Sequence, residues 1–499
     1  MKRIFTIPLI GVTIMPASGT LTASQNEQMN VLLIVADDLQ WSSIGACGSK
    51  APDITPNIDR FASQGLMFRN AHVTVGVSQP SRGALATGMY PHTSGVEAFN
   101  HTAGYVPTVM SELRSHGYRV GILGKYPHST PDISFVWDMS HDQSELGQGR
   151  NPRIYADYFR KFIRDSKQEG KPFYFMANSH DPHRPFHGSP GDIEMRKRSG
   201  DYPLPSRVYT PDEVEVPGFL PDIDSVRIEL SQYFSSVRRF DDFVGAVLQV
   251  LEEEGIRDRT AVFLLSDNGF SQPFSKANAY YQSTRTPLIV HYPGVTKAGS
   301  VDPVHFVSGI DFMPTVLESL GYSIPMGVDG RSYFGVLKGE KQEGRDKVFT
   351  QFYEVSANRR YPMFAVQDAK YLLIYNPWSD GNYRYNAESI ARTAIAFNGM
   401  LEAARTDSYI QSRVDMIIYR KPLELYDIEN DPDALFNLAT EDTYENVVKQ
   451  YSSYLLDWME RYDPTVFPAF SSFMKGESDD ERLRYMENQH KIPQERQRK

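Results

Sequence analysis

A continuous apolar run at Asn30–Val35 constrains the fold of this chain more than any other feature. The run, NVLLIV, shows no alternation of apolar and polar residues, which is typical of a strand buried on both faces of a parallel sheet. Similar strand-like runs recur at Tyr118–Lys125, Pro172–Asn178, Thr260–Gly269 and Thr286–Gly294. Helical patterns separate them, at Thr55–Gly65, Val106–Gly117, Arg153–Gly170 and Arg227–Gly255. This alternation predicts an α/β fold with a large mixed, mostly parallel sheet sandwiched by helices.

The alternation of strands and helices decays after about residue 345, where Tyr- and Arg-rich segments take over. We therefore expect an N-terminal α/β domain at residues 29–345 and a smaller C-terminal α+β domain at residues 346–475. Residues 476–499 form a charged tail that we expect to be loosely held. The segment from His187 to Asp224 is rich in Pro, Gly and charge without clear periodicity, so it is predicted to be an irregular excursion near the site.

Residues 1–24 have the pattern of a secretory signal peptide, with Lys2 and Arg3 before an apolar run and a small-residue site at Ala17–Gly19. The run is short and interrupted by proline, so we expect no membrane span, and an uncleaved anchor is the alternative. Cys47 is the only cysteine, which excludes an intramolecular disulfide. Export without disulfides predicts a bacterial periplasmic location. The net charge of −10 argues against nucleic acid as a partner.

The stretch Ser78–Arg82, with the sequence SQPSR, lies immediately before a small-residue helical run. Pro80 suits the first turn of a helix, because it has no N–H and a fixed φ. Ser78 would then stand at the helix N-terminus, where free N–H groups attract an anion, and Arg82 can turn back toward it. The stretch offers a hydroxyl nucleophile, an anion hole and a guanidinium. Taken alone, it is equally consistent with an ordinary capped helix start.

Two strand-like runs end in polar pairs, Asp37-Asp38 and Asp267-Asn268. In open α/β sheets ligands bind beyond the carboxyl ends of the strands, so we expect these pairs to meet. Three carboxylates and an amide oxygen are hard ligands that suit Ca²⁺ or Mg²⁺ and are poor for Zn²⁺. The alternative is that each pair caps the helix that follows it.

A third group of candidate residues is cationic and also follows the strand-like runs. Its members are Lys125, His128, His180, His183, Arg184 and Lys276. With Ser78 and the acidic pairs they describe a site for a tetrahedral anion, in which a metal and cations neutralise charge, a hydroxyl attacks and a histidine protonates the leaving group. This chemistry fits hydrolysis of a phosphate or a sulfate ester, and the residue types alone do not separate the two.

These motifs resemble those of the type I, formylglycine-dependent sulfatases, within the alkaline-phosphatase-like superfamily. The segments NVLLIVADD, SQPSRGALATG, GILGK, HDPHRP, LLSDNG and ELYDIENDPDALFNLA each look like a family motif, in the family's order, between Asn30 and Tyr462. The pentapeptide SQPSR matches the sulfatase pattern in which Cys or Ser is followed by x-Pro-Ser-Arg. The resemblance implies an alkaline-phosphatase-like fold and a hydrolase of sulfuric esters.

In this family the first residue of the pentapeptide is oxidised to formylglycine, whose hydrate is the nucleophile. That residue is Ser78 here, so the resemblance implies a serine-type sulfatase matured by a radical enzyme. It also implies one Ca²⁺, whose ligands would be Asp37, Asp38, Ser78, Asp267 and Asn268. Arg82 would steady the hydrate. The residues that bind sulfate or move protons would be Lys125, His128, His183 and Lys276, and those that bind the rest of the substrate would be His180 and Arg184.

Two loops depart from the common family pattern. The segment GKYPH is one residue longer than the usual Lys-x-His, which affects His128, and FSQPFSK lacks a His-Gly pair before Lys276. The shorter loop is most similar to the heparan N-sulfatase (N-sulfoglucosamine sulfohydrolase) branch, which has Arg in place of Lys276. We therefore expect release of sulfate from a glycosaminoglycan sugar, as an ester or a sulfamate. The alternatives are an O-sulfatase for a marine or algal polysaccharide of the ulvan type, a phosphatase or phosphodiesterase, and an unmatured glycan-binding protein.

Overall fold

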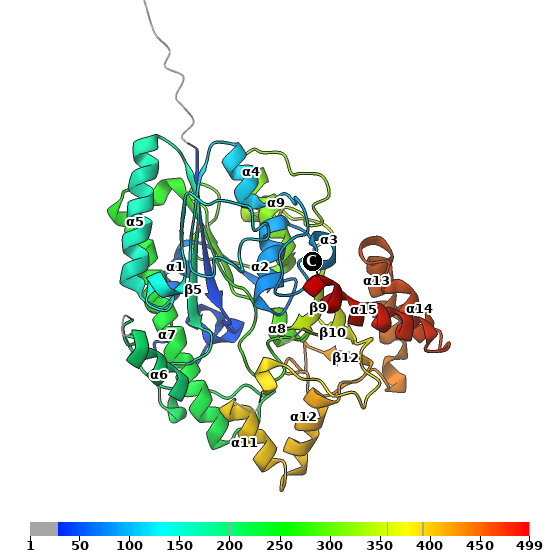
Figure 1. Cartoon of the computed structure of the whole chain (residues 1–499). Coiled ribbons are helices and arrows are strands. Elements are labelled where there is room, and N and C mark those ends of the chain that lie inside the picture. Colours follow the sequence, from blue (N-terminus) through cyan, green and yellow to red (C-terminus); the bar gives the residue numbers. More distant parts are fainter. Residues whose placement is uncertain (1–27, 200–201, 357, 392–393, 499) are drawn as a thin grey trace, which may run out of the picture.

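A large β-sheet organises the molecule (Figure 1). The computed structural model describes residues 28–199, 202–356, 358–391 and 394–498. The sheet has the strand order β4-β3-β5-β1-β6-β7-β2-β8. Its strands are β1 (Asn30–Asp37), β2 (Leu66–His72), β3 (Arg119–Leu123), β4 (Met139–His141), β5 (Phe173–Pro182), β6 (Thr260–Ser266), β7 (Leu288–His291) and β8 (Ser300–Ser308).

Strand β1 lies inside this sheet and pairs in parallel with β5 and β6. All of its residues are buried, and they alternate between two hydrophobic cores: Leu32 and Ile34 belong to one, Leu33 and Val35 to the other. The unbroken apolar run therefore supplies a side chain to each face of the sheet. Among the described strands of this sheet only β7 runs antiparallel to its neighbours, so the predicted mixed, mostly parallel sheet is confirmed.

Helices cover both faces of the large sheet (Figure 1). One face packs against α1 (Pro56–Gln64), α5 (Pro152–Glu169) and α7 (Asp224–Glu253). The other packs against α2 (Ser78–Thr87), α4 (Val109–Ser115) and α9 (Phe312–Ser319). Local signals fix their ends: Asn151 accepts the first free N–H groups of α5, and Gly170 ends it with a φ of 64°. Further helices are α3 (Pro91–Ser94), α6 (Pro190–Ser199), α8 (Tyr281–Thr284) and α10 (Phe334–Leu337).

The last third of the chain builds a small antiparallel sheet with its own helices, which agrees with the predicted α+β composition of this part. Its order is β12-β11-β10-β9, from β9 (Lys347–Val355), β10 (Arg359–Asp368), β11 (Tyr371–Tyr375) and β12 (Leu423–Asp427). The helices of this part are α11 (Ile395–Ala403), α12 (Ser408–Ile418), α13 (Glu445–Tyr462), α14 (Phe467–Met474) and α15 (Asp480–Arg498). The hydrophobic core around α7 continues into this sheet through residues such as Phe352, Phe364 and Leu373.

Two segments differ from the sequence expectation. The irregular excursion contains the helix α6, and the charged tail, expected to be loosely held, forms α15 and packs against β10. Tyr485 is only 5% exposed, and Gln489 Oε1 accepts a hydrogen bond from Arg360 Nε at 2.9 Å. The tail is held because it carries these few inward-facing side chains among many charges.

The predicted signal peptide, residues 1–24, lies outside the described residues. Within the described part of the chain, no helix combines the length and the apolar character needed to cross a membrane.

Candidate active site

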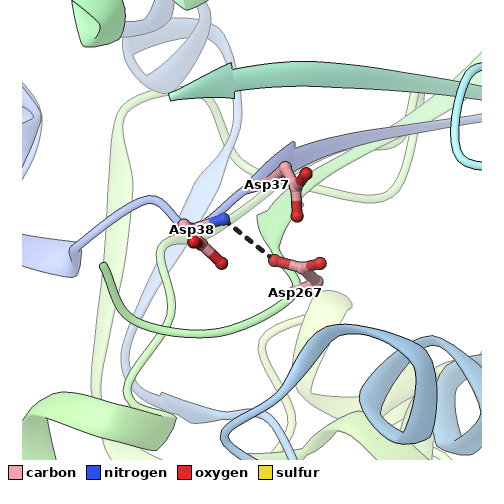
Figure 2. A group of neighbouring side chains, drawn as sticks. All are labelled: Asp37, Asp38 and Asp267. Carbon is pink, nitrogen blue, oxygen red and sulfur yellow. Dashed lines mark hydrogen bonds between the residues drawn. The ribbon is translucent and has the colours of Figure 1, made fainter. Parts of the chain in front are cut away.

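The two polar pairs predicted from the sequence meet at one end of the large sheet, and Figure 2 shows three of their four residues, Asp37, Asp38 and Asp267. Strands β1 and β6 are parallel neighbours, and Ala36 lies opposite Ser266 in their register. Asp37, Asp38 and Asp267 therefore emerge side by side, with carboxylate oxygens within 4.8 Å of one another. The backbone N–H of Asp38 donates to Asp267 Oδ1 at 3.1 Å, the dashed line in Figure 2. All three side chains are buried.

The start of α2 brings a hydroxyl group to this cluster. Ser78 is the first residue of the helix, and its Oγ lies 3.3 Å from both Asp37 Oδ1 and Asn268 Oδ1. Asn268 donates through Nδ2 to Asp38 Oδ1 at 2.7 Å. The five residues predicted as metal ligands are thus assembled around one buried place, where they offer oxygen donors. This donor set fits Ca²⁺, a hard cation that proteins bind through carboxylate and carbonyl oxygens.

Arg82 links α2 to two strand ends. Its Nε and Nη2 atoms each lie 2.9 Å from Asp267 Oδ2, and its Nη1 donates to Asn178 Oδ1 at 2.7 Å. These contacts to a carboxylate and an amide oxygen hold the buried guanidinium of Arg82 in one orientation. Asn178, which lies within β5 opposite Val35 of β1, was not singled out from the sequence. The sequence does contain an indication of its role, because Asn178 is the last residue of an apolar strand-like run that leads to the same edge of the sheet.

Two lysines and a histidine face the acidic cluster from other loops. Lys125 forms an ion pair with Asp37. Lys276 Nζ lies 2.8 Å from Asp38 Oδ2, and His183 Nε2 lies 3.8 Å from the same oxygen. Lys125 and Asp38 have φ values of 51° and 65°, a strained region for residues with a side chain. Such strain persists only where the surroundings enforce it, and it is common at functional sites.

The surroundings move the pKa values of two carboxyls in opposite directions. Burial works against ionisation of Asp37. The positive charges of Lys125, His183 and Arg82 outweigh this effect and hold the pKa of the carboxyl well below its usual value. Burial raises the pKa of Asp267 to about 6, against the opposing charge of Arg82. The carboxylate of Asp37 therefore stays ionised, whereas the carboxylate of Asp267 takes up a proton more readily.

His128 lies at the edge of the site. Its ring meets Phe99 edge-on, with a centroid distance of 5.4 Å. Burial, together with the charges of Lys125 and Arg82, lowers the pKa of His128 to about 4. His128 is therefore neutral at pH 7, where it can accept a proton and adds no standing positive charge.

His180 and Arg184, predicted to bind substrate, are held by other parts of the protein. His180 is 7% exposed and packs on Gly149, where φ is 69° and an added Cβ would lie 2.1 Å from the imidazole. Arg184 donates through Nη2 to the carbonyl oxygen of Ser271 at 2.9 Å and forms an ion pair with buried Glu229. His180 thus has little surface for a ligand, whereas 20% of the Arg184 side chain stays exposed.

A buried ion-pair cluster supports the loop that carries His183. Asp181 accepts hydrogen bonds from Arg239 at 2.6 and 2.8 Å and from Arg150 at 3.2 Å. Arg150 also donates to the carbonyl oxygen of His183 at 2.9 Å. Asp181 could have been found from the sequence, because it lies between two histidines already considered. Arg239 could not, because nothing in the helical pattern distinguishes it from its neighbour Arg238.

A cavity of about 410 Å³ opens beside His183 and Arg184. The starts of α6 and α11 and one face of α7 form its walls, and its lining includes Phe186, Gln232 and Ile395. Gln232 Oε1 is buried without a hydrogen-bond partner among the described residues. A cavity of this size, with apolar walls and a few polar groups, is typical of small-molecule sites.

Two family profiles match the chain. The profile described as "Sulfatase" matches residues 29–322, and the profile described as "N-sulphoglucosamine sulphohydrolase, C-terminal" matches residues 269–386. Among curated proteins, human N-sulphoglucosamine sulphohydrolase is 29% identical over 471 residues, which cover 88% of this chain and 91% of the relative. An ulvan-active sulfatase of Formosa agariphila is 26% identical over 472 residues, which cover 87% and 75%.

Solved structures share the fold. A protein in complex with its substrate D-glucosamine-2-N,6-O-disulfate superposes with a TM-score of 0.65 at 19% identity, over 88% of this chain and 98% of the other. A phosphonate monoester hydrolase of Agrobacterium radiobacter also has a TM-score of 0.65, at 18% identity, over 87% and 96%. The shape of the chain therefore does not distinguish sulfate from phosphonate hydrolysis.

Proposed function

This chain belongs to the sulfatase family of sulfuric ester hydrolases, and we propose that it removes sulfate from a carbohydrate with the help of Ca²⁺ and a formylglycine made from Ser78. The family is in general dependent on formylglycine and on a metal. The observation that carries the proposal is the buried assembly of the Ser78 hydroxyl, three carboxylates and an arginine at the end of the sheet. An N-sulfated glucosamine is our first choice of substrate, supported by the similarity to N-sulphoglucosamine sulphohydrolase.

The charge balance of the site supports a divalent cation and an anionic substrate. The three carboxylates are each paired with a cation, namely Arg82, Lys125 or Lys276, so the cluster as it stands is close to neutral. A Ca²⁺ ion held by the five oxygen-bearing residues would leave an excess of two positive charges, to which a protonated His183 adds the charge that leaves with its proton. A sulfate monoester brings one negative charge, and an ionised nucleophile brings a second. The site is therefore suited to a singly charged tetrahedral anion.

The proposed roles follow from these positions. A formylglycine at position 78 would supply, as its hydrate, the hydroxyl that attacks sulfur, and its return to the aldehyde would release the sulfate. Arg82 orients the attacking group, since it lies one helical turn from Ser78 and is fixed by Asp267. Lys125 and Lys276 neutralise the sulfate oxygens, where negative charge builds up. As the S–N or S–O bond breaks, His183 gives a proton to the leaving nitrogen or oxygen, because its ring borders both the acidic cluster and the cavity.

The sugar would occupy the cavity beside His183. Its volume of about 410 Å³ suits one sugar residue, and Arg184 and the unsatisfied Gln232 carbonyl provide polar contacts in its wall. His128 would accept or pass on a proton in its neutral form. His180 would contribute to substrate binding mainly by holding its own segment in place against Gly149, because its own surface is small.

Maturation and export complete the proposal. Conversion of Ser78 requires a serine-type radical sulfatase-maturing enzyme, since Cys47 is followed by GSKA and lacks the modification motif. Residues 1–24 would direct the protein to the periplasm as a signal peptide. Mass spectrometry of the mature N-terminus tests this step: a chain beginning after about residue 24 supports export, and retention of Met1 contradicts it.

An O-sulfatase acting on an ulvan-type polysaccharide is the second candidate, favoured by the 26% identity to an ulvan-active sulfatase. The decisive experiment incubates the protein, co-expressed with a maturing enzyme, with N-sulfated glucosamine, 6-O-sulfated glucosamine, ulvan oligosaccharides and a sugar phosphate. We expect sulfate from the N-sulfated sugar and none from a Ser78→Ala variant. Sulfate release from ulvan alone would support the second candidate, and phosphate release in excess of sulfate would overturn the sulfatase proposal.

A further inference from the structure

A second cavity, of about 370 Å³, lies where α15 packs over the turn between β9 and β10. We call it the distal pocket. Its lining includes Arg359, Tyr361, Tyr383, His490, Pro493 and Gln494. These residues come from three separate segments of the C-terminal part, so the pocket exists only because the charged tail folds back as α15.

The distal pocket is cationic and aromatic in a chain that is acidic overall. No carboxylate is present among the described residues that line it, although the whole chain has a net charge of −10. Arg360 also lines the pocket and is paired with Glu97 and Glu354, whereas Arg359 is exposed and has no ion pair within the described residues. Such a local positive patch attracts an anion.

An exposed tyrosine forms one wall of the distal pocket. Tyr383 is 52% exposed, and its ring lies 6.4 Å from that of Tyr361. The ring of Tyr361 in turn packs on the rings of Trp378 and Tyr385, at centroid distances of 5.0 and 4.9 Å. These contacts hold the aromatic wall of the pocket in one position. An aromatic face with a hydroxyl, beside a guanidinium and side-chain amides, suits a sugar ring that carries an anionic group.

Two chains of contacts run through the protein from residues around the distal pocket to residues beside the active site. On one side, Tyr385 donates a hydrogen bond to the carbonyl oxygen of Ala277, next to Lys276 of the acidic cluster. On the other, Arg496 of α15 donates to Asn100 at 3.3 Å. The backbone oxygen of Asn100 accepts from Gln79, the residue after Ser78, at 2.8 Å. Figure 1 shows α15, in red, reaching toward α3 on this side of the molecule.

We propose that the distal pocket binds an anionic sugar residue of a sulfated oligosaccharide whose terminal sugar occupies the active site. The proposal rests on the proposed function and adds to it a preference for oligosaccharides over single sugars. The anionic group is a sulfate or a uronic acid carboxylate, which present the same chemistry to Arg359.

The first test compares two substrates with the same terminal sugar, a sulfated monosaccharide and a sulfated tetrasaccharide. Arg359→Ala and Tyr383→Ala should each raise KM for the tetrasaccharide about tenfold, because a hydrogen bond to a charged group or a sugar-stacking ring is lost. Both variants should leave kcat/KM for the monosaccharide unchanged. The matched controls are Arg405→Ala, which removes an exposed arginine, and Tyr409→Ala, which removes a tyrosine that is also 52% exposed.

A binding measurement separates this proposal from the proposed function. Calorimetric titration with the tetrasaccharide reports on the distal pocket even if no sulfate is released. Weaker binding to both variants, with unchanged binding to both controls, supports the proposal. A desulfated tetrasaccharide that retains its carboxylates shows which anion is recognised. Equal affinity of the variants and wild type, or equal binding of a neutral tetrasaccharide of the same length, would overturn it.

Discussion

At the residue scale, the site is a set of ion pairs built around a place for one cation. Asp267 is held by Arg82, and the other two carboxylates of the cluster are paired with Lys125 and Lys276. Desolvated carboxylates so close together are stable only with such partners or with a metal. The loss of one carboxylate therefore removes a ligand and also leaves a buried cation unpaired.

Asp267→Asn should weaken Ca²⁺ binding by about 100-fold or more, because an anionic ligand becomes neutral while the shape of the side chain is kept. The measurement is calorimetric titration of Ca²⁺ into protein stripped of metal. Asp457→Asn, an exposed position on α13, is the matched control and should bind as wild type does. An unchanged affinity in the Asp267 variant would show that the cation binds elsewhere.

At the element scale, a small number of buried contacts determines which segments pack against the rest of the protein. α15 is highly charged, and its hold on the small sheet depends on side chains such as Tyr485 and Gln489. The same reasoning explains why α6 was not predicted from the sequence. Among its described residues only Asp192 is buried, so its sequence has no apolar stripe.

Tyr485→Ala should lower the free energy of unfolding by about 3 kcal/mol, since a large ring that is 5% exposed leaves a cavity in the small sheet's core. Leu483→Ala lies two residues away on the same helix, at a side chain that is 55% exposed, and should change it by less than about 0.5 kcal/mol. Urea unfolding measures both. Equal stability of the two variants would mean that α15 is not docked as described.

His72, at the end of β2, is a second buried contact between elements. Its Nδ1 lies 3.1 Å from Thr284 Oγ1, and its Nε2 lies 3.1 Å from Gln367 Nε2 of the small sheet. Burial, with the charge of Arg285, lowers the pKa of His72 to about 3. The unfolded chain binds a proton at this residue below about pH 6.5 and the folded chain does not. The stabilisation is therefore complete above that pH and is lost on acidification.

His72→Gln should make the free energy of unfolding less dependent on pH. Between pH 7 and pH 5 the loss of stability should be smaller than in wild type by about 2 kcal/mol, because the variant has no imidazole to protonate on unfolding. Urea titrations at the two pH values give this difference. His116→Gln, at an exposed position after α4, is the control and should follow wild type. The same loss in the His72 variant as in wild type would contradict the buried neutral imidazole.

At the scale of the whole molecule, the two sheets share one core. The hydrophobic cluster around α7 reaches Phe364 and Leu373, and polar contacts cross the same boundary. Arg420 donates to Asn278 Oδ1 at 2.6 Å and to Glu424 at 2.7 Å, all three buried. Asn278 lies two residues beyond Lys276, so the small sheet also supports a loop of the candidate active site.

The shared core predicts that the molecule unfolds in one cooperative transition. Calorimetry and tryptophan fluorescence should give the same midpoint, because Trp378 and Trp458 report on the small sheet and Trp137 on the large one. Arg420→Ala should lower that midpoint without splitting the transition. Two separated transitions would show that the parts fold independently.

The sequence predicted the architecture wherever burial produces a simple pattern of apolar and polar residues. The continuous run in β1 and the polar pairs at the ends of β1 and β6 predicted both the sheet and the cluster, because parallel neighbours end at one edge. It could not foretell contacts set by three-dimensional packing, such as Asn178 on Arg82 or Arg239 on Asp181. The antiparallel direction of β7 likewise depends on its neighbours and leaves no mark in a short apolar run.

The central claim is that Ser78 is the precursor of the nucleophile. Mass spectrometry of the peptide that contains Ser78, from protein produced in its native host, tests this most directly. The account predicts that this peptide has lost two hydrogen atoms, as conversion of serine to formylglycine requires. A peptide that carries only unmodified serine would contradict the account.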